Sequence, residues 1–159
     1  MFSFFLERKK LFSFGVACAI ALALFSACVP DEGTEIGVLT GYWQSSYGDG
    51  FEIIGNTFTQ YDDADKHISF AGEIVNNPDL QADSGSITLK ITDSGTWSKT
   101  VDCYIVVKWR GLSSIGVEQA AASNYPSDPA PGKLTKEEAE TVYTEENGYF
   151  GMFGAYQKQ

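Results

Sequence analysis

Short segments of alternating apolar and polar residues, separated by turn residues, constrain the fold of this chain more than any other feature. Residues 101–110 show the alternation most clearly, because every second position is apolar: Val101, Cys103, Ile105, Val107 and Trp109. A period of two is typical of a β-strand with one buried face. With weaker segments included, the pattern predicts eight short strands: 39–46, 51–54, 57–61, 68–74, 86–92, 101–110, 114–119 and 149–156.

One helix is predicted near the end of the chain. Thr135 is placed to be its N-cap, and Glu138 three residues later completes a capping-box pattern. Leu134 is spaced to pack against Ala139 as a hydrophobic staple. Asn147-Gly148 is expected to end the helix, because both residues tolerate the left-handed conformation.

Eight short strands with one late helix predict a mainly β fold. We expect a small up-and-down antiparallel barrel whose last strand follows the helix and pairs with the first, because closure removes exposed sheet edges. Gly55-Asn56 separates two of the predicted strands by two residues and so predicts a tight hairpin. The alternative is an open β-sandwich with the helix packed across one end.

The N-terminal region has the pattern of an export signal. Residues 8–10 are basic, and residues 11–25 form an apolar run that is shorter than the roughly 20 residues of a membrane-spanning helix. Ser26-Ala27-Cys28 has the small residues that a lipoprotein peptidase requires before a cysteine. We therefore predict a signal peptide at 1–27, a lipid on Cys28, a flexible acylated tether at 28–37 and a barrel domain at 38–159. The alternative is an uncleaved anchor helix.

The charge of the remaining chain excludes some partners. The predicted signal peptide holds three of the 11 basic residues and one of the 21 acidic ones, so the rest has a formal net charge of about −12. Such a chain does not suit nucleic acid, whose phosphates require basic surface. Cys103 would be the only free cysteine, and His67 is the only histidine. We therefore expect neither a disulfide nor a metal or other cofactor.

The first predicted strand carries a recognisable motif. Gly41-Tyr42-Trp43 resembles the G-x-W signature of lipocalin-type barrels, which place this tryptophan at the closed end of the barrel and an arginine from late in the barrel over it. The only arginine after the signal peptide, Arg110, comes early for that role.

More narrowly, residues 38–157 resemble a module of unknown function in spirochaete lipoproteins. The matching features are Trp43-x-Ser45, the hairpin from Ile53 to Phe58, Tyr104-x-Val106, Lys133-x-Thr135 and the run from Glu146 to Phe150. The resemblance implies a lipocalin-like barrel on a lipid-anchored protein, and it implies no activity.

Several residue groups are candidates for a site. If the barrel is hollow, the interior contacts of a small apolar ligand would include Trp43, Phe51, Phe58, Phe70, Ile105 and Trp109. So many bulky groups in a short barrel favour a filled core instead. The carboxylates of residues 62–65 offer oxygen ligands for calcium, but a solvated turn fits this acidic run better. Exposed aromatic residues are expected at Trp97, Tyr125 and Tyr156, where they would either be ordinary scattered surface residues, which is the favoured interpretation, or contact a protein partner.

These observations predict a bacterial envelope protein that is anchored by lipid at the outer membrane or the periplasmic face. We expect no enzymatic activity, because no catalytic group of residues stands out. The function would be a binding or interaction role through the loops of the barrel, with an unknown protein or a small apolar ligand as the partner. The alternative is a lipocalin-like carrier of a small hydrophobic ligand, which requires a connected apolar cavity of roughly 300 Å³ or more.

Overall fold

The structure, a computed structural model, describes residues 37–124 and 130–159. The predicted signal peptide, Cys28, nearly all of the tether and Tyr125 lie outside the described residues. The described elements are, in order, β1 Gly41–Gln44, β2 Gly50–Ile54, β3 Thr57–Tyr61, β4 Ile68–Ile74, β5 Gly85–Asp93, β6 Tyr104–Arg110, β7 Gly116–Ala121, α2 Lys136–Val142 and β8 Gly154–Lys158.

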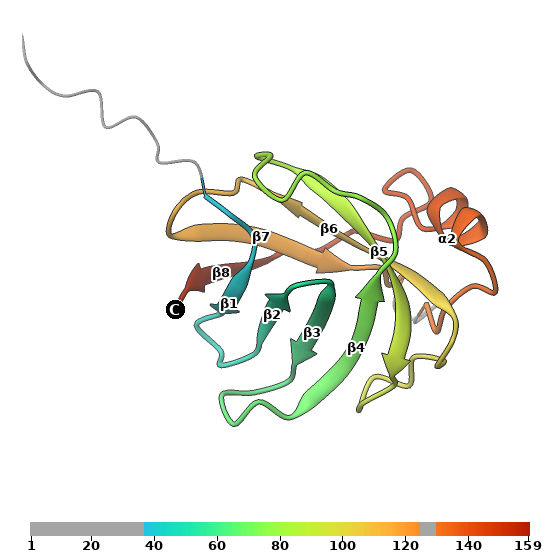
Figure 1. Cartoon of the computed structure of the whole chain (residues 1–159), viewed down its shortest axis with the longest axis horizontal. Helices are drawn as coiled ribbons and strands as arrows, with labels where there is room; N and C mark the ends of the chain where they lie inside the picture. Colours follow the sequence, from blue (N-terminus) through green and yellow to red (C-terminus); the bar gives the residue numbers. More distant parts are fainter. Residues whose placement is uncertain (1–36, 125–129) are drawn as a thin grey trace, which may run out of the picture. The chain divides into compact units, whose positions relative to one another are not determined.

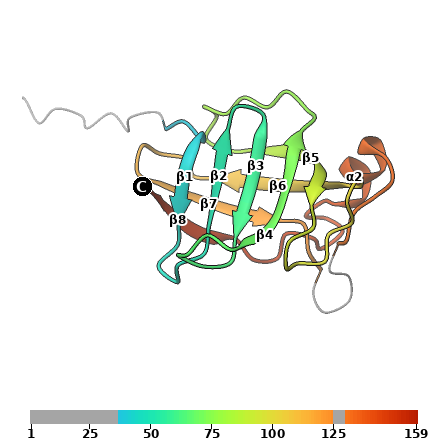
Figure 2. The same cartoon turned by 60° about the horizontal axis from the view of Figure 1, so that its bottom comes forward.

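The eight strands form one closed antiparallel barrel (Figures 1 and 2). Each strand pairs with the next in the sequence, and β8 closes the barrel by pairing with β1, where Trp43 is opposite Lys158 and Gln44 is opposite Gln157. The predicted barrel, with one helix before the closing strand, is confirmed. Closure leaves no unpaired edge strand, which explains why the open sandwich does not form.

Strand β6 begins later than the predicted start at residue 101. Asp102 has a φ of 65°, in the left-handed region, and an extended strand cannot pass through that conformation. Val101 is therefore 49% exposed and does not belong to the buried face. The other strand residues predicted for that face, Ile105, Val107 and Trp109, are buried.

The closing strand β8 also begins later than the predicted residue 149. Phe150 forms an isolated parallel bridge with Ser123, and the Ser123 amide donates to the Tyr149 carbonyl oxygen at 2.9 Å. Residues 149–153 thus precede the barrel ladder instead of belonging to it. They approach the end of β7, and several of them line the cavity described below.

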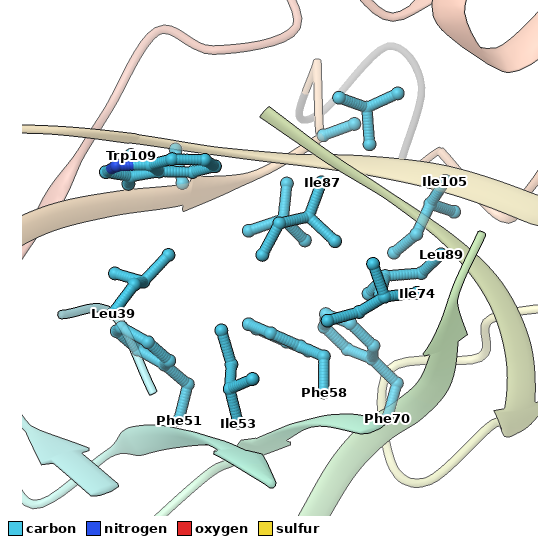
Figure 3. Close-up of a cluster of buried hydrophobic side chains, with 14 of the residues drawn as sticks. Leu39, Phe51, Ile53, Phe58, Phe70, Ile74, Ile87, Leu89, Ile105 and Trp109 are labelled. Atoms are coloured by element: carbon cyan, nitrogen blue, oxygen red, sulfur yellow. The ribbon is translucent and has the colours of Figure 1, made fainter. Parts of the chain in front are cut away.

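Bulky apolar side chains fill the interior of the barrel (Figure 3). Side chains from opposite walls, such as Phe51 and Phe58 on one side and Ile87 and Leu89 on the other, point toward one another. All four are completely buried. The alternation that predicts these strands therefore also identifies the core, because every second residue of a strand faces the same side.

Helix α2 covers the outer face of β5 and β6. Ala139 is its buried residue, and Glu140 accepts a hydrogen bond of 2.7 Å from the Thr88 hydroxyl of β5. The contact explains why Thr88 and Val106, which face away from the barrel interior, are almost completely buried.

The two ends of α2 are capped by side chains. Thr135 has extended dihedral angles, and its hydroxyl accepts the Glu138 amide at 3.2 Å, which confirms the predicted N-cap. The predicted staple is wrong, because Leu134 is 82% exposed. The helix ends at Val142, earlier than predicted, and the Asn147 side chain caps it by donating to the Val142 carbonyl at 2.9 Å.

Replacing Thr135 with alanine should lower the free energy of unfolding by about 1 kcal/mol, because the Glu138 amide loses its only side-chain acceptor at the helix start. Urea unfolding followed by circular dichroism measures the change. Thr141→Ala is the matched control, since the Thr141 hydroxyl only donates to the Glu137 carbonyl within the same helix. Equal stability losses in the two variants would contradict the cap.

Candidate functional site

A cavity of about 740 Å³ lies at one end of the barrel. We call this end the mouth. The loops β1–β2 and β3–β4 lie on this side (Figure 2), and Asp49 and Asp62 from these loops line the cavity. Trp97 from the β5–β6 loop, the end of β7 and residues 148–154 complete the wall. A volume of this size lies within the range of small-molecule sites.

Two buried glutamines line this cavity, and one amide atom of each has no hydrogen-bond partner. Gln60 on β3 and Gln119 on β7 are each only 4% exposed, and both line the cavity. Within the described residues, no atom pairs with Gln60 Oε1 or with Gln119 Nε2. A buried polar atom without a partner costs about 1–3 kcal/mol, so both positions favour a bound group that supplies the missing partners.

The strand registers explain why both amides point inward. Gln60 follows Phe58 by two residues on β3 and is opposite Phe51 of β2, so it shares their inward face. Gln119 is opposite Trp109 of β6, which also faces the interior. Polar side chains therefore occupy the mouth end of two strands whose other inward residues are apolar.

Tyr156 spans the wall beside these amides. Its hydroxyl donates to Asp49 Oδ2 at 3.0 Å, and its ring meets the edge of Phe51 with centroids 5.2 Å apart. A Cβ at Gly154 would approach the Tyr156 ring to 3.0 Å, so glycine leaves room for the ring there. Burial, followed by the nearby charge of Asp49, raises the pKa of Tyr156, which therefore remains a neutral hydrogen-bond donor. The expectation that Tyr156 is exposed is wrong.

Trp97 is held at the rim of the mouth. Its indole Nε1 donates to Asp62 Oδ1 at 2.8 Å, and the same carboxylate accepts hydrogen bonds from Ser69 and Thr96. The indole ring also packs against Phe70, with centroids 5.8 Å apart. Trp97 remains 45% exposed, as predicted, and it presents a fixed aromatic surface to the cavity.

The charge of the cavity wall is negative. Asp49 and Asp62 contribute carboxylates, and none of the described residues that line the cavity is basic. Both carboxylates accept hydrogen bonds from neighbouring side chains. The wall can therefore donate and accept hydrogen bonds, but it does not attract an anion.

The six residues predicted as interior contacts lie elsewhere. Trp43, Phe51, Phe58 and Phe70 form a stacked row along β1 to β4, with successive centroids 6.2, 5.7 and 5.9 Å apart. All four are completely buried, as is Ile105, and none of the five lines the mouth cavity.

Trp109, the sixth, borders a smaller hollow of about 410 Å³ outside the mouth. Its indole Nε1 donates to the Ala82 carbonyl at 3.0 Å. Lys108 and Arg110 also border this hollow, but each is paired with a glutamate. We assign no site there.

A cation does lie over the tryptophan of the G-x-W motif. Lys158 Nζ on β8 is 5.2 Å from the ring centroid of Trp43 and donates to the Val38 carbonyl at 3.0 Å. A lysine thus occupies the place where the resemblance implies an arginine. Arg110 instead lies 4.1 Å from the ring centroid of Phe153.

The acidic run at 62–65 forms internal contacts. Asp62 holds Trp97 as described, and Asp63 Oδ2 lies 2.7 Å from His67 Nδ1. Among the described residues, no group of three or more histidine, cysteine or acidic side chains is arranged to hold a metal ion.

The single histidine should titrate above its ordinary pKa of about 6.5. The hydrogen bond and charge of Asp63 raise the pKa of His67, because they favour the protonated ring. A raised pKa means that the pair stabilises the fold below about pH 6.5 and that this contribution is lost as the pH rises through the raised pKa. NMR titration of the imidazole ring measures the pKa of His67, and Asp63→Asn should lower that pKa. An identical pKa in the two proteins would contradict the pairing.

The alternation of apolar and polar residues places both glutamines at inward positions, which composition alone does not reveal. Gln60 continues the inward alternation set by Phe58, and Gln119 continues that of Val117. A polar residue at an inward position is the exception to search for in such a pattern. What the alternation cannot show is whether the side chain finds a partner inside the barrel.

Comparison with known proteins shows no relative. No protein-family model, no curated protein and no solved structure matches this chain. The structure defines a closed eight-stranded antiparallel barrel with a cavity at its mouth that polar and aromatic side chains line.

No helix in residues 37–124 and 130–159 is long and apolar enough to cross a bilayer.

Proposed function

We propose that this chain is a lipid-anchored bacterial envelope protein that binds a small ligand at the mouth of its barrel and carries out no chemistry. The observation that carries the binding role is the pair of buried, unpartnered amide atoms on Gln60 and Gln119, two residues that line one cavity of about 740 Å³. Polar groups that a folded chain buries without partners are commonly completed by a ligand or by ordered water.

The loops support the same role. Trp97 and Asp62 on two different loops hold each other in place, so part of the rim is ordered before any ligand arrives. Preorganisation of this kind lowers the entropic cost of binding. The binding that the sequence predicts through the barrel loops is thus assigned to the loops of the mouth. A protein partner would contact the same rim.

The anchoring role is supported by the sequence. Ser26-Ala27-Cys28 behind a basic and apolar leader suits lipid attachment, and the acidic tether after it suits a spacer between membrane and barrel. The location would be the outer membrane or the periplasmic face.

The packed interior favours this function over carriage of a hydrophobic molecule. An apolar ligand inside the barrel would have to displace the completely buried row from Trp43 to Phe70. An apolar ligand in the mouth would leave Gln60 Oε1 and Gln119 Nε2 without partners. A carrier would therefore need an interior different from the one that these side chains form.

Quenching of Trp97 fluorescence tests the binding role. Trp43 and Trp109 are buried, so acrylamide should quench mainly Trp97. The full chain, purified from its native membranes and held in phospholipid vesicles, is titrated with acrylamide in the presence of fractions of the cells' own small molecules. We expect at least one fraction to protect Trp97.

Trp97→Phe is the control, because it should remove the quenchable signal and keep an aromatic ring at the rim. If every fraction leaves the quenching of the wild-type protein unchanged, the binding role is wrong.

A further inference from the structure

The chemistry of the mouth also indicates what kind of ligand fits it. We propose that the cavity binds a neutral ligand that presents an amide group beside a flat apolar ring face, which is the chemistry of an N-acetylated pyranose sugar. This inference rests on the proposed function and names its ligand class.

The unpartnered atoms require an amide or an equivalent donor and acceptor. Gln60 Oε1 is an acceptor that lacks a donor, and Gln119 Nε2 is a donor that lacks an acceptor. An acetamido group supplies both, through its N–H and its carbonyl oxygen. A ligand with acceptors only would leave Gln60 unpaired, and an apolar ligand would leave both glutamines unpaired.

The rim provides a surface for a flat apolar face. Trp97 cannot rotate freely, because its Nε1 is bonded to Asp62 and one side of its ring packs against Phe70. Tyr149, held against Tyr143 with centroids 4.9 Å apart, lines the same cavity. Rigid aromatic side chains contribute a large contact area with little loss of side-chain entropy.

The charge of the wall selects against anions. Asp49 and Asp62 line the cavity, and no described lining residue is basic. A carboxylate or phosphate on the ligand would be repelled by both carboxylates without a compensating cation. The Asp49 carboxylate already accepts the Tyr156 hydroxyl at 3.0 Å, and Asp62 accepts Trp97 at 2.8 Å, so neither requires a cationic ligand.

Direct titration with defined probes tests the inference. The full chain in phosphatidylcholine vesicles is titrated with N,N′-diacetylchitobiose, and protection of Trp97 from acrylamide gives the dissociation constant. Cellobiose has the same pyranose rings without acetamido groups, and glucuronate carries a negative charge. Dodecanol is the neutral apolar probe, and its titration is corrected with protein-free vesicles. We expect diacetylchitobiose to bind at least tenfold more tightly than each of the other three.

Two variants assign the affinity to the amides. Gln60→Met and Gln119→Met keep the side-chain volume and remove the amide, so each should weaken binding of diacetylchitobiose about tenfold. Their thermal midpoints should change little, because each removes one buried polar atom that has no partner and puts an apolar group in its place. Gln157→Met is the matched control at an exposed position of β8 and should change neither property.

The outcomes separate this inference from the proposed function. If cellobiose or dodecanol binds as tightly as diacetylchitobiose, or if both glutamine variants bind diacetylchitobiose like the wild type, the amide inference is wrong. If the cells' own fractions protect Trp97 and diacetylchitobiose does not, this inference fails and the binding role stands. If neither protects Trp97, both proposals fail.

Discussion

Replacing Trp43 with alanine should lower the free energy of unfolding by about 3–5 kcal/mol, the usual cost of truncating a buried aromatic residue. Trp43 is completely buried and stacks on Phe51 with centroids 6.2 Å apart. The variant would also leave the Leu39 carbonyl without the indole donor that now lies 2.8 Å away. Since a domain of this size has about 5–15 kcal/mol in total, the loss would leave the barrel marginal. Urea unfolding followed by circular dichroism measures it.

Alanine variants of the other two tryptophans, Trp109 and Trp97, are compared with Trp43→Ala. Trp109→Ala should cost a similar amount, because Trp109 is buried and its Nε1 donates to the Ala82 carbonyl. Trp97→Ala is the control at the half-exposed rim and should cost about 1 kcal/mol. If Trp43→Ala and Trp109→Ala unfold like the wild type and instead lose a bound small molecule, these tryptophans are ligand contacts, and the protein is a carrier with its site inside the barrel.

Replacing Cys28 with serine should abolish lipid attachment and release the protein from membranes. Only a thiol can form the thioether to the lipid, and the sequence before Cys28 suits no other attachment point. Metabolic labelling with a tagged fatty acid and fractionation of the cells measure both effects. We expect labelling of the wild-type protein and none of the variant.

Cys18→Ser is the matched control for this experiment. It makes the same change within the apolar run of the leader, away from the predicted attachment point, and should leave labelling and membrane association intact. Labelling that persists in Cys28→Ser would contradict lipid attachment there. Membrane association without labelling in the wild type would support the uncleaved anchor helix.

Local sequence determined the elements of the fold. Alternation identified all eight strands and placed Phe51, Phe58, Ile105 and Trp109 in the interior, because a strand turns successive side chains to opposite faces. The cap at Thr135 could be predicted for the same reason, since it depends only on residues within one turn. Where prediction failed, as at the start of β6, a single residue with left-handed dihedral angles ended the pattern.

Tertiary structure alone decided the site. Gln60 and Gln119 lie on β3 and β7, strands that do not pair with each other, and only closure of the barrel brings them to one mouth. Whether a buried amide has a partner depends on every neighbour in space, so no local pattern could show that these two have unpaired atoms. The expectation that Tyr156 is exposed is wrong for the same reason. Its hydroxyl reaches Asp49, 107 residues earlier in the chain, because its own strand β8 closes the barrel.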